Sequence, residues 1–338
     1  TSILIIGIFT LVYTYLGGLK AVVAMDVVQL FIYLSGAVAS MVIILNYLPN
    51  GWNDVILQAT ANGQNKFEIF NLSWGTGIIS FFSSPYTLLG GLLGGTFLTM
   101  ASHGTDQLLV QRLLGCKSRW DSQRALMLDA VMIVLQFAFF LILGLCLYAF
   151  YNGVPFDQLG LNSSDEIFPK FIVENLPTGL AGLVIAGVFA SAMGSLSSSI
   201  SSLASSTYLD LFKMTAKGKS LDPKGELAWS KVFTLLWGFI LIGGAMIFTD
   251  NKNPVVELRL KIASFTYGGL LGTFFLGLIF KRTNQRDAFV GFVAGLLTMI
   301  AVLSYTRIDW TWHTLIGCIA TILVGNRSSK IITHKSEI

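Results

Sequence analysis

The sequence predicts an all-α membrane protein, and three observations lead to that fold class. Of its 338 residues, 54% are hydrophobic and only 12% are charged, about half of the roughly 25% that is usual in soluble domains. The apolar residues form runs long enough to cross the ~30 Å hydrocarbon core of a bilayer as helices. The alternating segments of about ten residues that are typical of a membrane β-barrel do not occur in the sequence.

These apolar runs predict about nine transmembrane helices. They cover residues 2–16, 21–47, 77–101, 125–152, 178–212, 228–248, 262–280, 288–304 and 310–325. The runs 125–152 and 178–212 are longer than a bilayer is thick, so we expect them to tilt or to extend beyond it. Segments rich in Asn, Gly, Pro and charge separate the runs and are typical of loops.

Basic residues predict the orientation of these helices. Most of the 22 Lys and Arg residues fall in alternate connections, among them Lys20, residues 112–124, 213–231 and 281–286, and the C-terminal tail. Because cytoplasmic loops carry an excess of Lys and Arg, this side is predicted to be cytoplasmic. We expect the protein to lie in the plasma (inner) membrane with its C-terminus in the cytoplasm. The small net charge of +4 comes from loops, so it indicates a lipid bilayer and not a nucleic acid as partner.

Residues that would indicate an enzyme are missing from the sequence. It contains no HExxH, no GxSxG between a strand and a helix, and no P-loop ending in GK[ST]. Cys116, Cys146 and Cys318 lie far apart, so they are predicted to be small apolar residues of the interior, not a disulfide or zinc site. We therefore expect neither catalysis nor an organic cofactor.

A serine-rich stretch within residues 178–212 is the most unusual feature of the sequence. At 100° per residue, Ser191, Ser195, Ser198 and Ser202 share one face of a helix, with Gly194 and Ser197 on either side. Hydroxyl and carbonyl oxygens are suitable ligands for a hard cation such as Na⁺. Alternatively, the small residues allow another helix to pack closely, with hydrogen bonds across the interface.

Asp26 lies inside the apolar run 21–47. A carboxylate in this position needs a polar partner, a cation or a proton. The serine-rich helix would be a suitable companion if it lies nearby. The alternative is that Asp26 reaches the cytoplasmic interface.

The run 77–101 contains Pro85 and the pairs Gly90-Gly91 and Gly94-Gly95. Such interruptions are typical of the discontinuous helices that line binding sites in transporters. The glycines are also compatible with close helix packing. Near the end of this run, Thr99, Ser102 and His103 are candidates to face a solute, although His103 fits the cytoplasmic interface equally well.

Glu257 and Lys261 are separated by four positions at the start of a predicted helix. This spacing predicts an ordinary ion pair on the helix surface.

Four segments of the chain resemble the sodium:solute symporter family. Residues 13–29 resemble the junction of core helices four and five, residues 106–112 the segment after helix six, residues 190–210 helix eight, and residues 275–282 the end of helix ten. The four segments occur in the order of the family and span most of the chain. The resemblance implies an inverted-repeat (LeuT-like) transporter bundle.

In that pattern, residues 1–280 would form core helices four to ten, and residues 281–338 would form two peripheral helices and a cytoplasmic tail. The chain begins at Thr1 in an apolar run without an initiator Met. We therefore expect the N-terminal helices of the bundle to be missing from it, and we expect this chain alone not to transport.

The resemblance further implies two sodium positions. At the one common to the family, Ser191 would offer its carbonyl and Ser195 its hydroxyl, whereas Gly194 stands where relatives often have a hydroxyl. Carbonyl ligands from helix one would complete it.

The second position is implied by similarity to the sialic acid transporters of the family. Asp26, Ser197 and Ser198 match its ligands, and Gly194 could add a carbonyl. The family's sugar transporters, in contrast, carry an Asn-x-x-Tyr-Trp pattern where this chain has Thr99, Ser102 and His103.

The function implied is sodium-coupled symport of a small organic solute by alternating access, with Na⁺ as coupling ion. Galactose-type recognition is not supported, so sialic acid, other sugars, carboxylates, vitamins and amino acids stay open as solutes. The alternative is a membrane sensor or receptor that keeps the transporter fold without transport.

Overall fold

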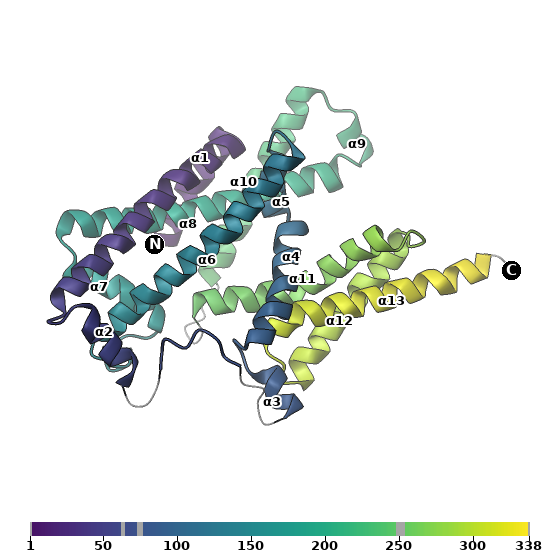
Figure 1. Cartoon of the computed structure of the whole chain (residues 1–338). Helices are drawn as coiled ribbons and strands as arrows, with labels where there is room; N and C mark the ends of the chain where they lie inside the picture. The colour runs from purple at the N-terminus through teal and green to yellow at the C-terminus, as the bar shows by residue number, and fades with distance from the viewer. Residues whose placement is uncertain (1, 62–64, 73–76, 248–253, 337–338) are drawn as a thin grey trace. The chain divides into compact units, whose positions relative to one another are not determined.

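The computed structural model describes residues 2–61, 65–72, 77–247 and 254–336, and these residues contain helices and no strand. The predicted all-α class is therefore confirmed. The chain divides into two compact units (Figure 1). Unit 1 comprises Thr1–Lys66 and Gly115–Lys252, and unit 2 comprises Phe67–Leu114 and Asn253–Ile338.

Unit 1 is built around long helices. Its elements are α1 (Ser2–Tyr47), α2 (Trp52–Ala59), α6 (Arg119–Phe150), η3 (Ser164–Glu166), α7 (Ile167–Asn175), α8 (Thr178–Ser206), η4 (Thr207–Phe212), α9 (Ala216–Lys219) and α10 (Pro223–Ile247). Helix α8 continues into the π-helical turn η4, so that residues 178–212 form one apolar helix of 35 residues. At 1.5 Å per residue this helix exceeds a hydrocarbon core of ~30 Å, as its sequence predicts.

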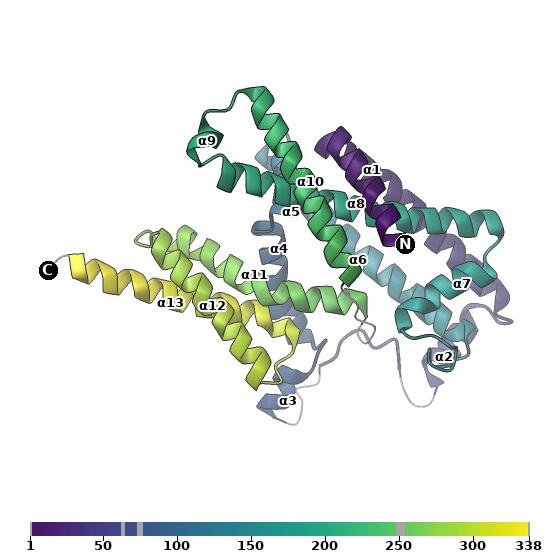
Figure 2. The same ribbon diagram turned by 180° about the vertical axis from the view of Figure 1, so that it is seen from behind.

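Helix α1 (Ser2–Tyr47) covers both of the predicted helices 2–16 and 21–47. The hydroxyls of Thr14 and Ser197 are 2.7 Å apart, and Asp26 lies against Gly194, one turn away on α8. In a straight helix, Thr14 and Asp26 would be separated by about 18 Å along the axis. Helix α1 therefore bends sharply between them, and Figures 1 and 2 show its ribbon turning back. The side chains of residues 17–25, including Lys20, lie outside the described residues.

Both arms of α1 pack closely on other helices of unit 1. On the first arm, Leu11 meets Gly238 of α10. On the second arm, Ile32 meets Gly187 of α8. Glycines at these positions let the helices approach, as is usual where helices associate in a bilayer.

Five helices of unit 1 pack together around an apolar core. Its buried members come from α1, α2, α6, α7 and α8 and include Ile44, Val55, Leu143 and Phe171. Cys146 is a free and fully buried member of this core, as the sequence predicts for an apolar filler.

Unit 2 contains a bundle of helices joined to a broken segment. Its elements are α3 (Ile78–Ser83), η2 (Gly90–Gly94), α4 (Gly95–Gly104), α5 (Gln107–Leu114), α11 (Val255–Ile279), α12 (Gln285–Tyr305), η5 (Trp310–Trp312) and α13 (His313–Ser336). Helices α11, α12 and α13 pack against one another (Figure 2). Small residues meet where they cross, as at Gly268 opposite Gly317 and Gly272 opposite Thr321.

The predicted interruption of residues 77–101 is confirmed. Helix α3 ends at Ser83, and the helix resumes only beyond Pro85, through the π-helical turn η2. A Cβ atom on Gly94 would overlap the carbonyl oxygen of Thr311, whereas one on Gly91 would meet nothing within 4 Å. The break and the close packing predicted at the glycines are therefore both present.

Six helices of the described residues are long and apolar enough to cross a membrane. They are residues 26–47, 119–150, 178–212, 223–247, 255–279 and 285–305. The other three predicted spans correspond to the short apolar arm 2–16, the broken segment of unit 2 and α13. The chain is a multi-pass membrane protein. The number of nine spans and the cytoplasmic C-terminus stay predictions. Lys252, a basic residue between two of the predicted spans, lies outside the described residues.

Candidate functional site

The serine-rich face of α8 divides into a buried and an open part. Ser197, Ser198 and Ser202 are 0%, 1% and 7% exposed, and Gly194 is buried with them. Ser195 is exposed and Ser191 is partly exposed. Each residue turns a helix by 100°, so Ser195 points away from the side on which Gly194 packs. The structure therefore separates the two sets of residues that the sequence analysis assigns to two sodium positions.

The second arm of α1 directs two oxygen-bearing side chains at Gly194. Asp26 Oδ1 lies 2.6 Å, and Gln29 Oε1 2.7 Å, from the place that a Cβ atom on Gly194 would occupy. Gln29 is buried, at 5% exposure. Asp26 therefore faces the serine-rich helix, one turn from Ser197 and Ser198, as one of the two alternatives for it predicts.

The first arm of α1 adds hydroxyl groups to the same place. Thr14 Oγ1 lies 2.7 Å from Ser197 Oγ and 2.7 Å from the carbonyl oxygen of Thr10. The Tyr13 hydroxyl donates a hydrogen bond to the Met193 carbonyl at 3.0 Å. Side-chain and carbonyl oxygens from three helical segments therefore meet around Gly194 and Ser197, an arrangement suited to a hard cation.

Thr14 and Gln29 are site candidates that the sequence analysis does not name. A signal for each is present in the sequence. Thr10 and Thr14 are four apart in the apolar run 2–16, and Gln29 follows Asp26 by three positions. Residues three or four apart share a helix face, so both pairs mark polar stripes in apolar helices.

The candidate solute residues lie together on α4 in unit 2. Ser102 Oγ is 2.8 Å from His103 Nδ1, and His103 Nδ1 is 3.2 Å from the Thr99 carbonyl oxygen. Thr99 is exposed, and the side chains of the other two are partly exposed. Helix geometry alone brings these three residues together.

Asp106 connects the end of α4 to α11. Its Oδ1 accepts a hydrogen bond from the Leu108 backbone N–H at 2.9 Å, and its Oδ2 accepts one from the Tyr267 hydroxyl. An acceptor at this position satisfies a free N–H of the first turn of α5. The structure thus gives Asp106 a role in holding the α4–α5 junction against α11.

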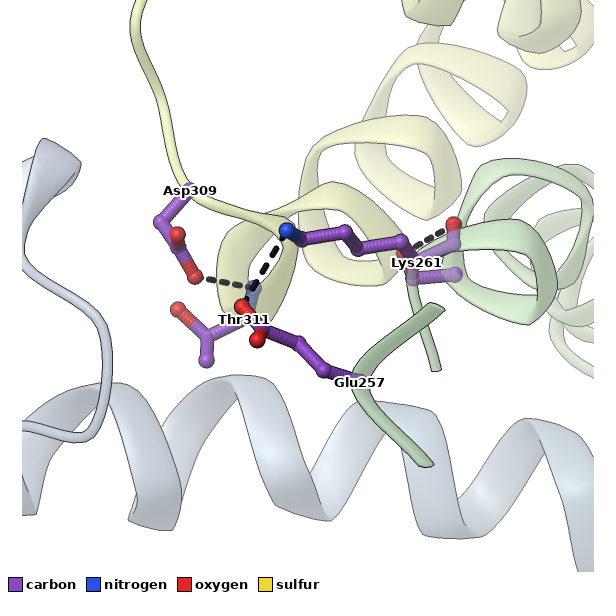
Figure 3. A network of polar contacts seen from close by, with 5 residues as sticks. Glu257, Lys261, Asp309 and Thr311 are labelled. Atoms are coloured by element: carbon purple, nitrogen blue, oxygen red, sulfur yellow. Dashed lines mark hydrogen bonds and ion pairs between the residues drawn. The ribbon is translucent and has the colours of Figure 1, made fainter. Parts of the chain in front are cut away.

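A polar network lies at the start of α11. Lys261 pairs with Glu257 at 3.1 Å, which confirms the predicted ion pair (Figure 3). Asp309, in the connection before η5, accepts a hydrogen bond from the Thr311 backbone N–H at 3.4 Å (Figure 3). Burial raises the pKa of the Asp309 carboxyl, although the Thr311 N–H and the nearby Lys261 oppose that shift.

The raised pKa of Asp309 gives an expected pH dependence of stability. Because the folded state holds the proton more tightly, this carboxyl favours folding at low pH and disfavours it as pH rises through the folded pKa. Asp309→Asn removes the charge and keeps a side-chain oxygen for the Thr311 N–H. We expect the thermal midpoint of the variant to rise relative to that of the parent as the pH increases from about 4. A difference independent of pH between 4 and 7 would contradict this assignment.

The comparison with protein families decides what kind of protein carries these residues. A profile described as "Sodium:solute symporter family" matches residues 1–295. The chain belongs to the sodium:solute symporter family. The resemblance found in its four sequence segments is therefore confirmed.

Among sodium:solute symporters and related transporters, the chain is similar to proteins with different named solutes. It is 26% identical to the sodium/sialic acid symporter NanT of Aliivibrio fischeri over 96% of this chain and 62% of that protein. It is 30% identical to a putative sodium-dependent multivitamin transporter of Drosophila melanogaster over 89% of this chain and 48% of that protein. Mouse sodium-coupled monocarboxylate transporter 1 is 30% identical over 86% of this chain and 46% of its own length. The chain thus spans about half to two thirds of these relatives.

Membership of the sodium:solute symporter family implies Na⁺ as coupling ion. Carboxylate, hydroxyl, amide and carbonyl oxygens are the ligand types that hard cations take. Within the described residues, no group of three or more His, Cys, Asp or Glu could hold a metal ion. The side-chain and carbonyl oxygens that α1 and α8 bring together are of these types.

Proposed function

We propose that this chain forms a large part of a sodium-coupled symporter that moves a small organic solute by alternating access. The observation that carries the proposal is the position of Asp26, which meets Gly194 beside the buried hydroxyls of Ser197 and Ser198. Carboxylates between membrane helices are costly and mark ion or substrate pathways. A bound Na⁺ would offset the charge of Asp26 and would be coordinated by the oxygen atoms around it.

The second sodium position would be formed by Asp26, Ser197 and Ser198, with the Gly194 carbonyl. Two further oxygens are available to it, the hydroxyl of Thr14 and the amide oxygen of Gln29. Since Asp26 and Gln29 occupy the space of a side chain at residue 194, a glycine fits there and a hydroxyl residue does not. Differential affinity of this site for sodium in two conformations would shift the population between them.

The sodium position common to the family would use the Ser191 carbonyl and the Ser195 hydroxyl, with carbonyls from helix one of the bundle. We expect Ser195→Ala to raise the sodium concentration for half-maximal uptake roughly tenfold, since a contact to a charged group contributes about 1.5 kcal/mol. Gly194 provides no neighbouring hydroxyl to compensate. Uptake against sodium concentration measures the effect, and Ser304→Ala, which removes an exposed hydroxyl near the end of α12, is the control. Equal curves for both variants would remove Ser195 from the site.

The solute would contact Thr99, Ser102 and His103 of α4. Sialic acid, monocarboxylates and vitamins are the first candidates, because relatives are named for them. We further propose the inverted-repeat bundle of the family, a plasma membrane location and a cytoplasmic C-terminus. The relatives are transporters by name, which favours symport over a sensor.

Uptake by the full-length protein in liposomes tests the proposal. An inward sodium gradient, compared with an equal potassium gradient, is applied to labelled sialic acid, monocarboxylates, vitamins, sugars and amino acids. We expect sodium-dependent accumulation of one solute class. Specific binding of a solute without accumulation under either gradient would support the sensor instead.

A further inference from the structure

A large groove lies within unit 2 beside the α4–α5 junction. Its volume is about 1150 Å³, and its walls come from that junction, α11 and α12. Its apolar residues include Leu270, Phe274, Phe289 and Phe292. The Phe292 ring lies against Gly269, where a Cβ atom would meet it at 3.0 Å, so the helices are close together at the base of the groove.

Two polar residues of the groove lie at one end of α12. Gln285 and Arg286 are the first two residues of this helix, and both line the groove. From Gln285 to Phe292, α12 descends about 10 Å along its axis. The groove therefore has a polar mouth and an apolar interior that extends about two thirds of the thickness of one leaflet, since half of the ~30 Å hydrocarbon core is ~15 Å.

The mouth of the groove is basic. Arg286, the second residue of α12, is exposed, and Lys281 and Arg282 lie before it in the connection from α11. The neighbouring Asp287 is fully buried and is hydrogen-bonded inside the protein. Its carboxylate accepts hydrogen bonds from the Ser328 hydroxyl at 2.8 Å and the Asn284 N–H at 3.0 Å.

We propose that this groove binds an anionic phospholipid, with the phosphate at Arg286 and one acyl chain along the apolar residues of α11 and α12 that line the groove. The guanidinium group binds phosphate oxygens in a bidentate manner, and the amide of the adjacent Gln285 can donate a further hydrogen bond. The apolar walls of the groove surround the acyl chain and separate it from the other lipids of the bilayer. This site goes beyond the proposed transport function and does not depend on it.

The lipid would contact the junction that Asp106 and Tyr267 secure. Gly104 and Thr105, at the end of α4, line the groove, and the same helix carries Thr99, Ser102 and His103. A bound lipid would thus stabilise the helix to which we assign the solute contacts.

Native mass spectrometry of the purified chain in detergent tests the site. The probes are dioleoylphosphatidylglycerol, dioleoylphosphatidylcholine with the same chains, and glycerol 3-phosphate, which has no chain. We expect preferential retention of phosphatidylglycerol. Arg286→Gln should lower it about fivefold, the effect of one basic residue near an anionic lipid, and should lower retention of phosphatidylcholine less, because its choline cation already offsets the phosphate. Lys224→Gln, which removes an exposed basic residue at the start of α10, should change neither lipid.

Filling the groove provides a second, independent variant. Leu270→Trp should reduce retention of phosphatidylglycerol by occupying the space of the acyl chain, and Thr273→Phe serves the same purpose if the first variant fails to fold by circular dichroism. Equal retention of the two lipids by the parent chain, or no effect of Arg286→Gln, would overturn the proposal. So would competition by glycerol 3-phosphate at the affinity of the lipid, or displacement of lipid by a second copy of the chain.

Discussion

Replacing Asp26 by Asn is expected to abolish sodium-dependent uptake by the full-length protein. The substitution keeps the size of the side chain and removes its charge, so that a bound Na⁺ loses the one carboxylate that faces Gly194. Removing one partner of a fully buried ion pair costs about 3–5 kcal/mol, and the cost should be somewhat lower for Asp26, which is partly exposed. Sodium affinity should therefore fall by roughly 100-fold, because each 1.4 kcal/mol corresponds to a factor of ten.

The measurement is solute uptake as a function of sodium concentration, with protein amount and thermal stability determined in parallel. Asp129→Asn is the matched control, since it removes another acidic residue from a membrane-spanning helix, α6, at an exposed position. We expect the control to retain the sodium activation curve of the parent. An unchanged curve in a well-folded Asp26→Asn protein would exclude Asp26 from the sodium site.

Replacing Gly194 by Ala is the second change from which we expect a large effect. The new methyl group would lie 2.6 Å from Asp26 Oδ1 and 2.7 Å from Gln29 Oε1, far inside normal contact distance. The side chains of Asp26 and Gln29 would have to turn away from α8. Overpacking costs about 1–3 kcal/mol, and the turn would also move the carboxylate away from its place beside α8. We expect a lower thermal midpoint together with the loss of sodium dependence.

Gly182→Ala provides the control on the same helix. A Cβ atom on Gly182 would meet nothing within 4 Å. Because alanine favours a helix over glycine by up to ~1 kcal/mol, this variant should be as stable as the parent or more stable. The two variants are compared in thermal unfolding and in sodium-dependent uptake. If they behave alike, the close approach of α1 to Gly194 is not what holds the site together.

Local features of the sequence determined much of this protein. Residues 178–212 form one long helix with the predicted boundaries, and the run with Pro85 is broken as predicted. The Glu257–Lys261 ion pair also follows from spacing alone. Hydrophobic length, a missing backbone N–H and helix periodicity act within a few residues, so they can be recognised without knowing what the helix packs against. For the same reason the family resemblance was present in short segments of the chain.

Only the tertiary structure decided which oxygens of the candidate site meet. Ser195 and Ser198 share a helix face by periodicity, yet one is exposed and the other is buried. Burial depends on where α1 lies, and the bend in α1 places Thr14 beside Ser197 and Asp26 beside Gly194. These partners are far apart along the chain, and contacts of that kind arise from packing between helices, which no property of a single helix specifies.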